Sequence, residues 1–170
     1  MPELIAPTAD LHAAWLAAHR EWGPGLHEDG FGLRPADEVD SFAGFTAWIN
    51  RLTEDARSAV CTYRWIADGE QVLGGIALRH GFGDFVRHAG HIGYGIRPSA
   101  RRRGLATWAL GRMLGEARAL GMAEVLIVCA DENVASARTI ERHGGSLESI
   151  LDSEYGVVRR YWIELGEQPG

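Results

Sequence analysis

A strand–helix–strand pattern in the second half of the chain constrains the fold more than any other feature. Ala89–Ile96 is apolar enough for a strand, and Pro98 ends it. Gly104–Leu120 carries apolar residues on one face at helical spacing, and Gly121 stands where a helix terminus favours glycine. Val125–Cys129 is a continuous apolar run, which is typical of a strand buried on both faces. The pattern therefore predicts a strand, a long helix and a buried strand in succession.

The rest of the chain supplies further short elements. Strands are expected at Glu3–Ala6, Val60–Ala67, Gln71–Leu78, Ser146–Leu151 and Val158–Leu165. Helices are expected from Thr8 or Asp10 through His19, from Asp37 or Asp40 through Leu52, and over Asn133–His143, and a plain connection over Gly81–His88. The order predicts an α/β (α+β) fold, a mixed sheet with helices on both faces, and 170 residues fit a single domain.

Composition and charge exclude several classes of function. All 17 basic residues are arginine, so catalysis by a lysine side chain and a Walker-type phosphate loop are excluded. Cys61 and Cys129 are too few for a disulfide scaffold and lack metal-ligand spacing. No apolar run reaches the roughly 20 residues of a membrane span, and no secretory signal is evident at the N-terminus. We expect a reduced cytoplasmic protein without a metal.

The net charge of −6 is unevenly placed, and arginines gather between the first strand and the long helix. Residues 1–96 hold 7 Arg and 13 acidic residues, whereas residues 97–170 hold 10 of each. Arg97, Arg101, Arg102 and Arg103 precede Gly104, which lets the backbone approach a ligand closely. N–H groups at a helix start, together with arginines, favour a phosphate. This segment predicts a pyrophosphate site.

Three other interpretations of this segment compete with that prediction. A nucleic-acid patch would need interleaved aromatic residues and a basic chain, and neither is present. A dinucleotide loop would need G-x-G-x-x-G after a strand, and that pattern is absent. An ordinary exposed helix start remains as the third alternative.

Residues 90–147 resemble the acetyl-CoA-binding core of the GNAT N-acetyltransferase superfamily. Arg101, Gly104 and Ala106 match the family's R/Q-x-x-G-x-G/A signature, and Asp131–Ser136 resembles its second cofactor-contact region. Residues 91–98 and 159–163 are similar to a bacterial subgroup of predicted acetyltransferases. The resemblance implies a mixed, mostly antiparallel central sheet of six to seven strands with a splayed cofactor slot. It also implies one domain over residues 1–170. Acceptor-side elements would occupy residues 1–89, the cofactor core residues 90–147, and C-terminal strands residues 148–170.

The resemblance further implies acetyl-CoA as co-substrate. Backbone amides of Arg102–Thr107 would hold the pyrophosphate, and Tyr94–Ile96 would pair with the pantetheine arm like an added strand. An N–H near Ile96 would polarise the thioester carbonyl. The implied cofactor-binding residues are Tyr94, Gly95, Ile96, Arg101, Arg102, Arg103, Gly104, Leu105, Ala106, Thr107, Asn133 and Ser136.

The implied reaction is direct attack of a neutral amine on acetyl-CoA, which needs a route for the amine proton. His91 is the first candidate base, and a hydrogen-bonded structural histidine is the alternative. Further candidates are Asp84, His80 and His88 in the preceding connection and Tyr161 on the last strand. Many family members carry a tyrosine that serves as the acid for the leaving thiolate, seven residues after the asparagine that corresponds to Asn133. This chain has Ile140 at that position.

The acceptor side is less defined by sequence. Trp15, Trp22, Phe42, Phe45 and Trp48 either line an acceptor pocket or belong to the core, and Cys129 is expected to be inert packing. The prediction is an N-acetyltransferase for a primary amine of a small molecule or peptide, cationic if the acidic half attracts it. The alternatives are a non-catalytic acyl-CoA sensor and an acyltransferase with another acyl-CoA or an O-acceptor. Nucleic-acid and membrane partners are not expected, and a homodimer is one option for the oligomeric state.

Overall fold

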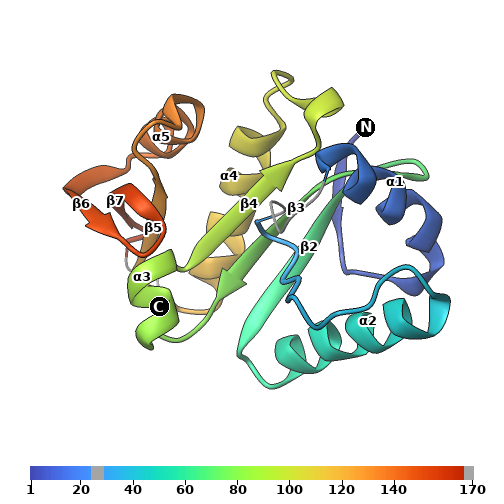
Figure 1. The fold of residues 1–170 in the computed structure, drawn as a ribbon. Coiled ribbons are helices and arrows are strands. Elements are labelled where there is room, and N and C mark those ends of the chain that lie inside the picture. Colours follow the sequence, from blue (N-terminus) through green and yellow to red (C-terminus); the bar gives the residue numbers. More distant parts are fainter. Residues whose placement is uncertain (24–28, 167–170) are drawn as a thin grey trace. The chain divides into compact units, whose positions relative to one another are not determined.

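The computed structural model describes residues 1–23 and 29–166 (Figure 1). The chain divides into two compact units. The first unit comprises Met1–His80 and Tyr94–Leu105, and the second comprises Gly81–Gly93 and Ala106–Gly170. Both units draw on segments from either side of residue 90. The predicted division into acceptor-side and cofactor-side segments is a statement about roles, and it stays a prediction.

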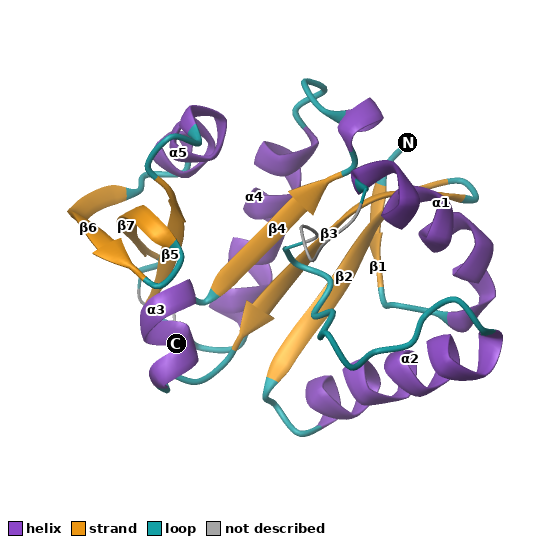
Figure 2. Cartoon of the chain, in the orientation of Figure 1, coloured by secondary structure: helices purple, strands orange, loops and turns teal. Residues whose placement is uncertain are grey.

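The described residues form seven strands in two sheets (Figure 2). One sheet has the order β1-β2-β3-β4, with β1 Glu3–Ile5, β2 Cys61–Asp68, β3 Gln71–Arg79 and β4 Ile92–Ile96. The other has the order β5-β7-β6, with β5 Glu124–Ala130, β6 Ser146–Ser153 and β7 Gly156–Glu164. The mixed, largely antiparallel α+β fold is confirmed, but a single central sheet is wrong because hydrogen bonding divides the strands into four and three.

Two helices cover the first sheet and bury an aromatic core. Helix α1 (His12–Trp22) contacts β3 and α2 (Phe42–Arg57) contacts β2. The predicted aromatic residues Trp15, Phe45 and Trp48 are at most 1% exposed and pack around Trp65 of β2. Three of the five aromatic pocket candidates are therefore core residues. Of the other two, Trp22 packs at the edge of this core and Phe42 is 63% exposed.

The start of α2 differs from its prediction. Neither Asp37 nor Asp40 caps the helix; Ser41 does, because its Oγ accepts the N–H of Gly44 at 3.0 Å. The side chain of Glu38 in turn accepts the N–H groups of Asp40 and Ser41. The acidic residues before α2 therefore order the approach to the helix rather than its first turn.

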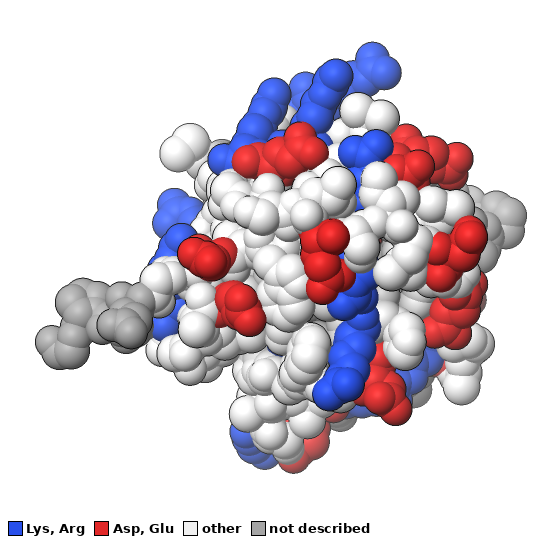
Figure 3. Space-filling view, turned by 90° about the vertical axis from the view of Figure 1, so that its left-hand side faces the viewer, with Lys and Arg blue, Asp and Glu red and all other residues white. Residues whose placement is uncertain are grey.

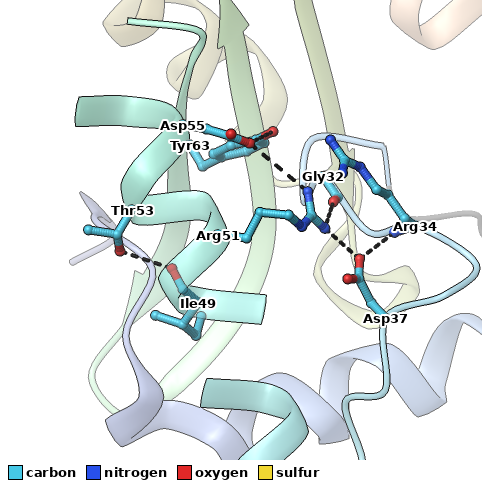
Figure 4. A network of polar contacts seen from close by, with 8 residues as sticks. All are labelled: Gly32, Arg34, Asp37, Ile49, Arg51, Thr53, Asp55 and Tyr63. Atoms are coloured by element: carbon cyan, nitrogen blue, oxygen red, sulfur yellow. Dashed lines mark hydrogen bonds and ion pairs between the residues drawn. The ribbon is translucent and has the colours of Figure 1, made fainter. Parts of the chain in front are cut away.

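A half-buried arginine holds residues 32–37, which lie between α1 and α2, in place (Figure 4). The guanidinium of Arg51 donates to the carbonyl of Gly32 at 3.0 Å and to the carboxylate of Asp37. It also lies 4.0 Å from Asp55, which accepts the hydroxyl of Tyr63 at 3.4 Å. Burial raises the pKa of Tyr63, so this hydroxyl stays protonated. The network joins the loop to α2 and β2.

The second unit is built from a long helix, two short helices and the three-stranded sheet. Helix α4 (Leu105–Ala119) ends as predicted, since the N–H of Gly121 donates to Arg118 and that of Met122 to Ala117. Helix α5 (Val134–Arg142) and α3 (Asp84–Ala89) both contact β5. Four of the five residues of the apolar run Val125–Cys129 in β5 are buried, as its sequence indicated, and Val128 is half-buried.

Helix α3 is a correction, because a plain connection was expected there. It has only six residues, too few for an apolar period, and its one buried residue is Val86. Its last residues shorten the following strand: β4 starts at Ile92 rather than Ala89. Short 3-10 turns also precede α1 (Ala9–Leu11) and follow β4 (Pro98–Ala100). In the described part of the chain, no helix has the length and hydropathy to cross a membrane.

Candidate active site

The predicted site residues fall in both units, and the two groups are described separately. Tyr94–Ile96, Arg101–Leu105 and His80 belong to the first unit. His91, Asp84, Tyr161, Ala106, Thr107, Asn133 and Ser136 belong to the second. The chain passes from one unit to the other after His80, after Gly93 and after Leu105.

The loop before α4 contains two residues with a left-handed backbone. Arg102 has φ 62° and Gly104 has φ 74°, so two residues near the helix start are left-handed. Left-handed residues beside a helix start turn successive N–H groups toward the same concavity. No atom lies within 4 Å of a Cβ added at Gly104, and residues 101–104 are exposed. The loop is therefore open to a ligand on the side of Gly104.

The three arginines of this loop have different surroundings. Arg101 folds back, and its Nε donates to the carbonyl of Ile96 at 3.0 Å, at the end of β4. Arg102 and Arg103 are exposed, and their side chains make no hydrogen bond or ion pair with any residue that the structure describes. Two arginines are thus available to an anion, and the third fixes the loop to the strand.

The strand β4 is approached closely by backbone in the first unit. A Cβ on Gly95 would lie 2.9 Å from the carbonyl oxygen of Asp29 and 3.5 Å from the ring of Trp22. A Cβ on Gly74 would collide with the carbonyl oxygen of Gly95. Gly95 is a predicted pantetheine contact, so Asp29 lies directly against that part of β4.

His91 ties the chain before β4 to β5. Its N–H donates to the carbonyl of Leu126 at 2.7 Å, and its Nδ1 accepts the N–H of Leu126 at 2.8 Å. The neighbouring Gly90 forms an isolated antiparallel bridge with Ile127. The side chain is 6% exposed and stacks on Phe82 at 5.6 Å between ring centroids. An imidazole that accepts a backbone N–H at Nδ1 has used the lone pair that a base needs, so the geometry favours the structural alternative.

The other candidate proton carriers differ in accessibility. Tyr161 is 1% exposed and donates to Glu141 Oε1 at 2.7 Å; burial raises its pKa, and the hydrogen bond to Glu141 raises it further. His80 Nε2 lies 2.7 Å from Thr62 Oγ1 in the first unit. His88 is bound to the carbonyl of Asp84 at 2.7 Å. The Asp84 carboxylate is exposed at the first position of α3, where a helix start favours an anion.

The second cofactor-contact region is the capped start of α5. Asn133 is the N-cap, and its Oδ1 accepts the N–H of Ser136 at 3.1 Å. Ile140, in place of the family's Tyr, is fully buried against Gly145. Cys129 is 8% exposed and burial raises the pKa of its thiol, which agrees with inert packing. Thr107 Oγ1 lies 3.4 Å from Thr139 Oγ1, which links α4 to α5.

Comparison with known proteins identifies the family. The sequence model described as "Acetyltransferase (GNAT) domain" matches residues 5–146. The chain therefore belongs to the GNAT acetyltransferases, as the Arg101–Gly104–Ala106 signature predicted. No curated protein sequence matches the chain significantly.

Solved structures agree with the fold. A ribosomal-protein-S5-alanine acetyltransferase from Vibrio fischeri has TM-score 0.76 and 14% identity over 99% of this chain and 96% of its own. RimL, a ribosomal L7/L12 α-N-protein acetyltransferase in complex with coenzyme A, has TM-score 0.75 and 17% identity over 96% of this chain and 93% of its own. The microcin C7 self-immunity acetyltransferase MccE, in complex with acetyl-CoA and AMP, has TM-score 0.71 and 17% identity over 96% of this chain and 92% of its own. At these identities the likeness concerns the fold alone.

Proposed function

We propose that the protein transfers the acetyl group of acetyl-CoA to a primary amine by direct attack. The observation that carries this proposal is the open loop before α4, with its left-handed Arg102 and Gly104 and the unengaged Arg103, in a GNAT chain. Backbone N–H groups and guanidinium groups of this kind suit a pyrophosphate.

The cofactor-binding roles follow from the same resemblance. Amides of residues 102–107 would hold the pyrophosphate, with Arg101 fixing the loop to β4 and Arg102 and Arg103 adding charge. Tyr94–Ile96 would bind the pantetheine arm, and Asn133 and Ser136 would contact the cofactor from the start of α5. Acetyl-CoA supplies the activated thioester.

In the transfer, the amine nitrogen bonds to the acetyl carbon, the carbon–sulfur bond breaks, and the thiolate leaves. The amine loses one proton and the thiolate takes one, which is a modest demand because a thiol has a pKa of about 8.5. Asp84 is the predicted base whose carboxylate stays exposed, and it is our candidate beside a water chain. His91 and Tyr161 are bound to Leu126 and Glu141, which supports positioning roles for both.

The acceptor class rests on charge and on the neighbours. Two similar structures are named as acetyltransferases of ribosomal proteins, which supports a peptide or protein amine as an acceptor to test. Acidic and basic side chains are interspersed on the face seen in Figure 3, where every basic group is an arginine. Local carboxylates rather than a uniform field would therefore select a cationic amine. Two cysteines without a disulfide bond support the proposal that the protein acts in a reducing cytoplasm.

Release of free thiol from acetyl-CoA across a panel of amines tests this function. We expect turnover with cationic amines or peptide N-termini to exceed turnover with matched acceptors that carry additional carboxylates. The Asp84→Asn variant is expected to lose about 10²-fold or more in turnover if Asp84 is the base, and Asp152→Asn on β6 serves as a control. Cofactor binding without turnover on any acceptor would instead favour the non-catalytic sensor, an alternative supported by Ile140.

A further inference from the structure

The carboxylate of Glu21, at the end of α1, accepts hydrogen bonds from Arg97 and Ser99 in the loop between β4 and α4 of the first unit. Oε2 accepts from Arg97 Nε at 2.8 Å, from the Arg97 terminal nitrogen at 2.6 Å, and from Ser99 Oγ at 3.0 Å. Oε1 accepts the backbone N–H of Ser99. Both carboxylate oxygens of Glu21 thus accept hydrogen bonds. They join α1 to residues that lie more than 75 positions later in the chain.

The Glu21–Arg97 pair is itself anchored. Arg97 donates its backbone N–H to Leu73 at 2.8 Å and a guanidinium nitrogen to Val72 at 3.3 Å, so β3 holds the arginine. The side chains of Arg97 and Glu21 are only 16% and 25% exposed. The hydrogen bonds from Ser99, followed by those from Arg97, lower the pKa of Glu21 despite partial burial. The carboxylate therefore stays ionised at neutral pH.

These contacts fix the loop just upstream of its proposed ligand-binding turn. Residues 97 and 99 are held by Glu21, and Arg101 is held by Ile96. Arg102 then adopts φ 62°, a conformation that costs a non-glycine residue energy and persists only where the surroundings impose it. A loop held at three positions keeps that turn formed before a ligand arrives.

We propose that Glu21 is a positioning residue that preorganises this loop for the phosphates of the cofactor. The inference rests on the proposed function, because it assumes that residues 102–107 bind the pyrophosphate. Glu21 reaches no cofactor atom in this scheme; it removes the entropic cost of ordering the loop upon binding. Its effect should therefore appear with ligands that carry phosphates and be absent with ligands that lack them.

The test compares two ligands and two matched variants. Glu21→Gln keeps the shape of the side chain but removes its charge, and Glu54→Gln makes the same change at a carboxylate that also accepts from a serine and pairs with an arginine. Binding of acetyl-CoA is measured by calorimetry and binding of acetyl-pantetheine by NMR titration. We expect Glu21→Gln to weaken acetyl-CoA binding about tenfold, which is about 1.4 kcal/mol, and to leave acetyl-pantetheine within about twofold. We expect Ser99→Ala, a milder change, to weaken acetyl-CoA binding by a smaller factor.

Each other outcome overturns the inference in a recognisable way. Equal acetyl-CoA affinity for wild type and Glu21→Gln would show that the loop forms without Glu21, while the proposed function would stand. Equal loss for both ligands, with a lowered melting temperature, would show a merely structural role. If wild-type protein bound no acetyl-CoA, the proposed function would fail together with this inference.

Discussion

Replacing His91 separates a structural role from a catalytic one. In His91→Ala, the buried N–H of Leu126 loses its acceptor, which costs about 1–3 kcal/mol. The variant also loses the packing of the ring against Phe82 and Trp162, worth about 1–2 kcal/mol. We therefore expect a loss of about 2–5 kcal/mol, a large part of the ordinary 5–15 kcal/mol of a folded domain.

His91→Asn is the matched control. The Asn Oδ1 takes nearly the place of Nδ1 and can accept the same N–H, but the side chain has no titrating nitrogen. We expect His91→Asn to retain most of the stability that His91→Ala loses, and to keep thiol-release activity within about tenfold of wild type.

Urea denaturation followed by tryptophan fluorescence reports the stability of all three proteins, and Trp162 lies beside the mutated position. Two results would refute the structural role of His91. One is a His91→Ala protein whose free energy of unfolding is unchanged. The other is a stable His91→Asn protein whose turnover falls by a factor of 10² or more, since that is the mark of a lost general base.

Three further predictions concern stability. Arg51→Met should cost about 2 kcal/mol in urea denaturation, because Asp37 and the Gly32 carbonyl lose their donor; unchanged stability would contradict the network in Figure 4. Gly74→Ala should lower the melting temperature sharply, since its Cβ would meet a backbone carbonyl of β4, and a melting temperature equal to wild type would contradict that close approach. Hydrogen bonds from Arg160, and then from Trp162, lower the pKa of Glu148, so its stabilisation is present above the ordinary Glu pKa and is lost as pH falls through the folded value. Glu148→Gln should therefore flatten the loss of stability below about pH 4.5, and an unaltered slope would argue against that ion pair.

The sequence predicts best those features of the fold that depend on residues close together in the chain. The end of α4 follows from local hydrogen bonds at Gly121, and α5 begins directly after Asn133, where the helix was expected to start. Asp37 and Asp40 were wrong as caps because several cap-forming residues stand close together, and Ser41 is the one whose side chain accepts an N–H group of the first turn.

Features that depend on distant residues could not be predicted in the same way. The division into two sheets is a matter of which strands share hydrogen bonds, and strand sequences alone do not encode their partners. The contact of Glu21 with Arg97 joins α1 to the loop after β4 without any local signal. The hydrogen bond from Leu126 to His91 likewise joins residues 35 positions apart, and it favours the structural one of the two roles that the sequence left open for His91.

Calorimetric titration of acetyl-CoA into wild type, Gly104→Glu and Gly115→Glu tests the central claim most directly. Gly115 lies further along α4, is exposed, and has open space around an added Cβ, so it receives the same substitution away from the loop. Glutamate at position 104 adds a negative charge and a side chain at a left-handed residue of the proposed phosphate loop. We predict binding to wild type and to Gly115→Glu within about twofold of each other, and binding at least about tenfold weaker to Gly104→Glu, whose fold is checked by circular dichroism. Unchanged affinity in Gly104→Glu, or no binding to wild type at hundreds of micromolar (roughly −5 kcal/mol), would contradict the account.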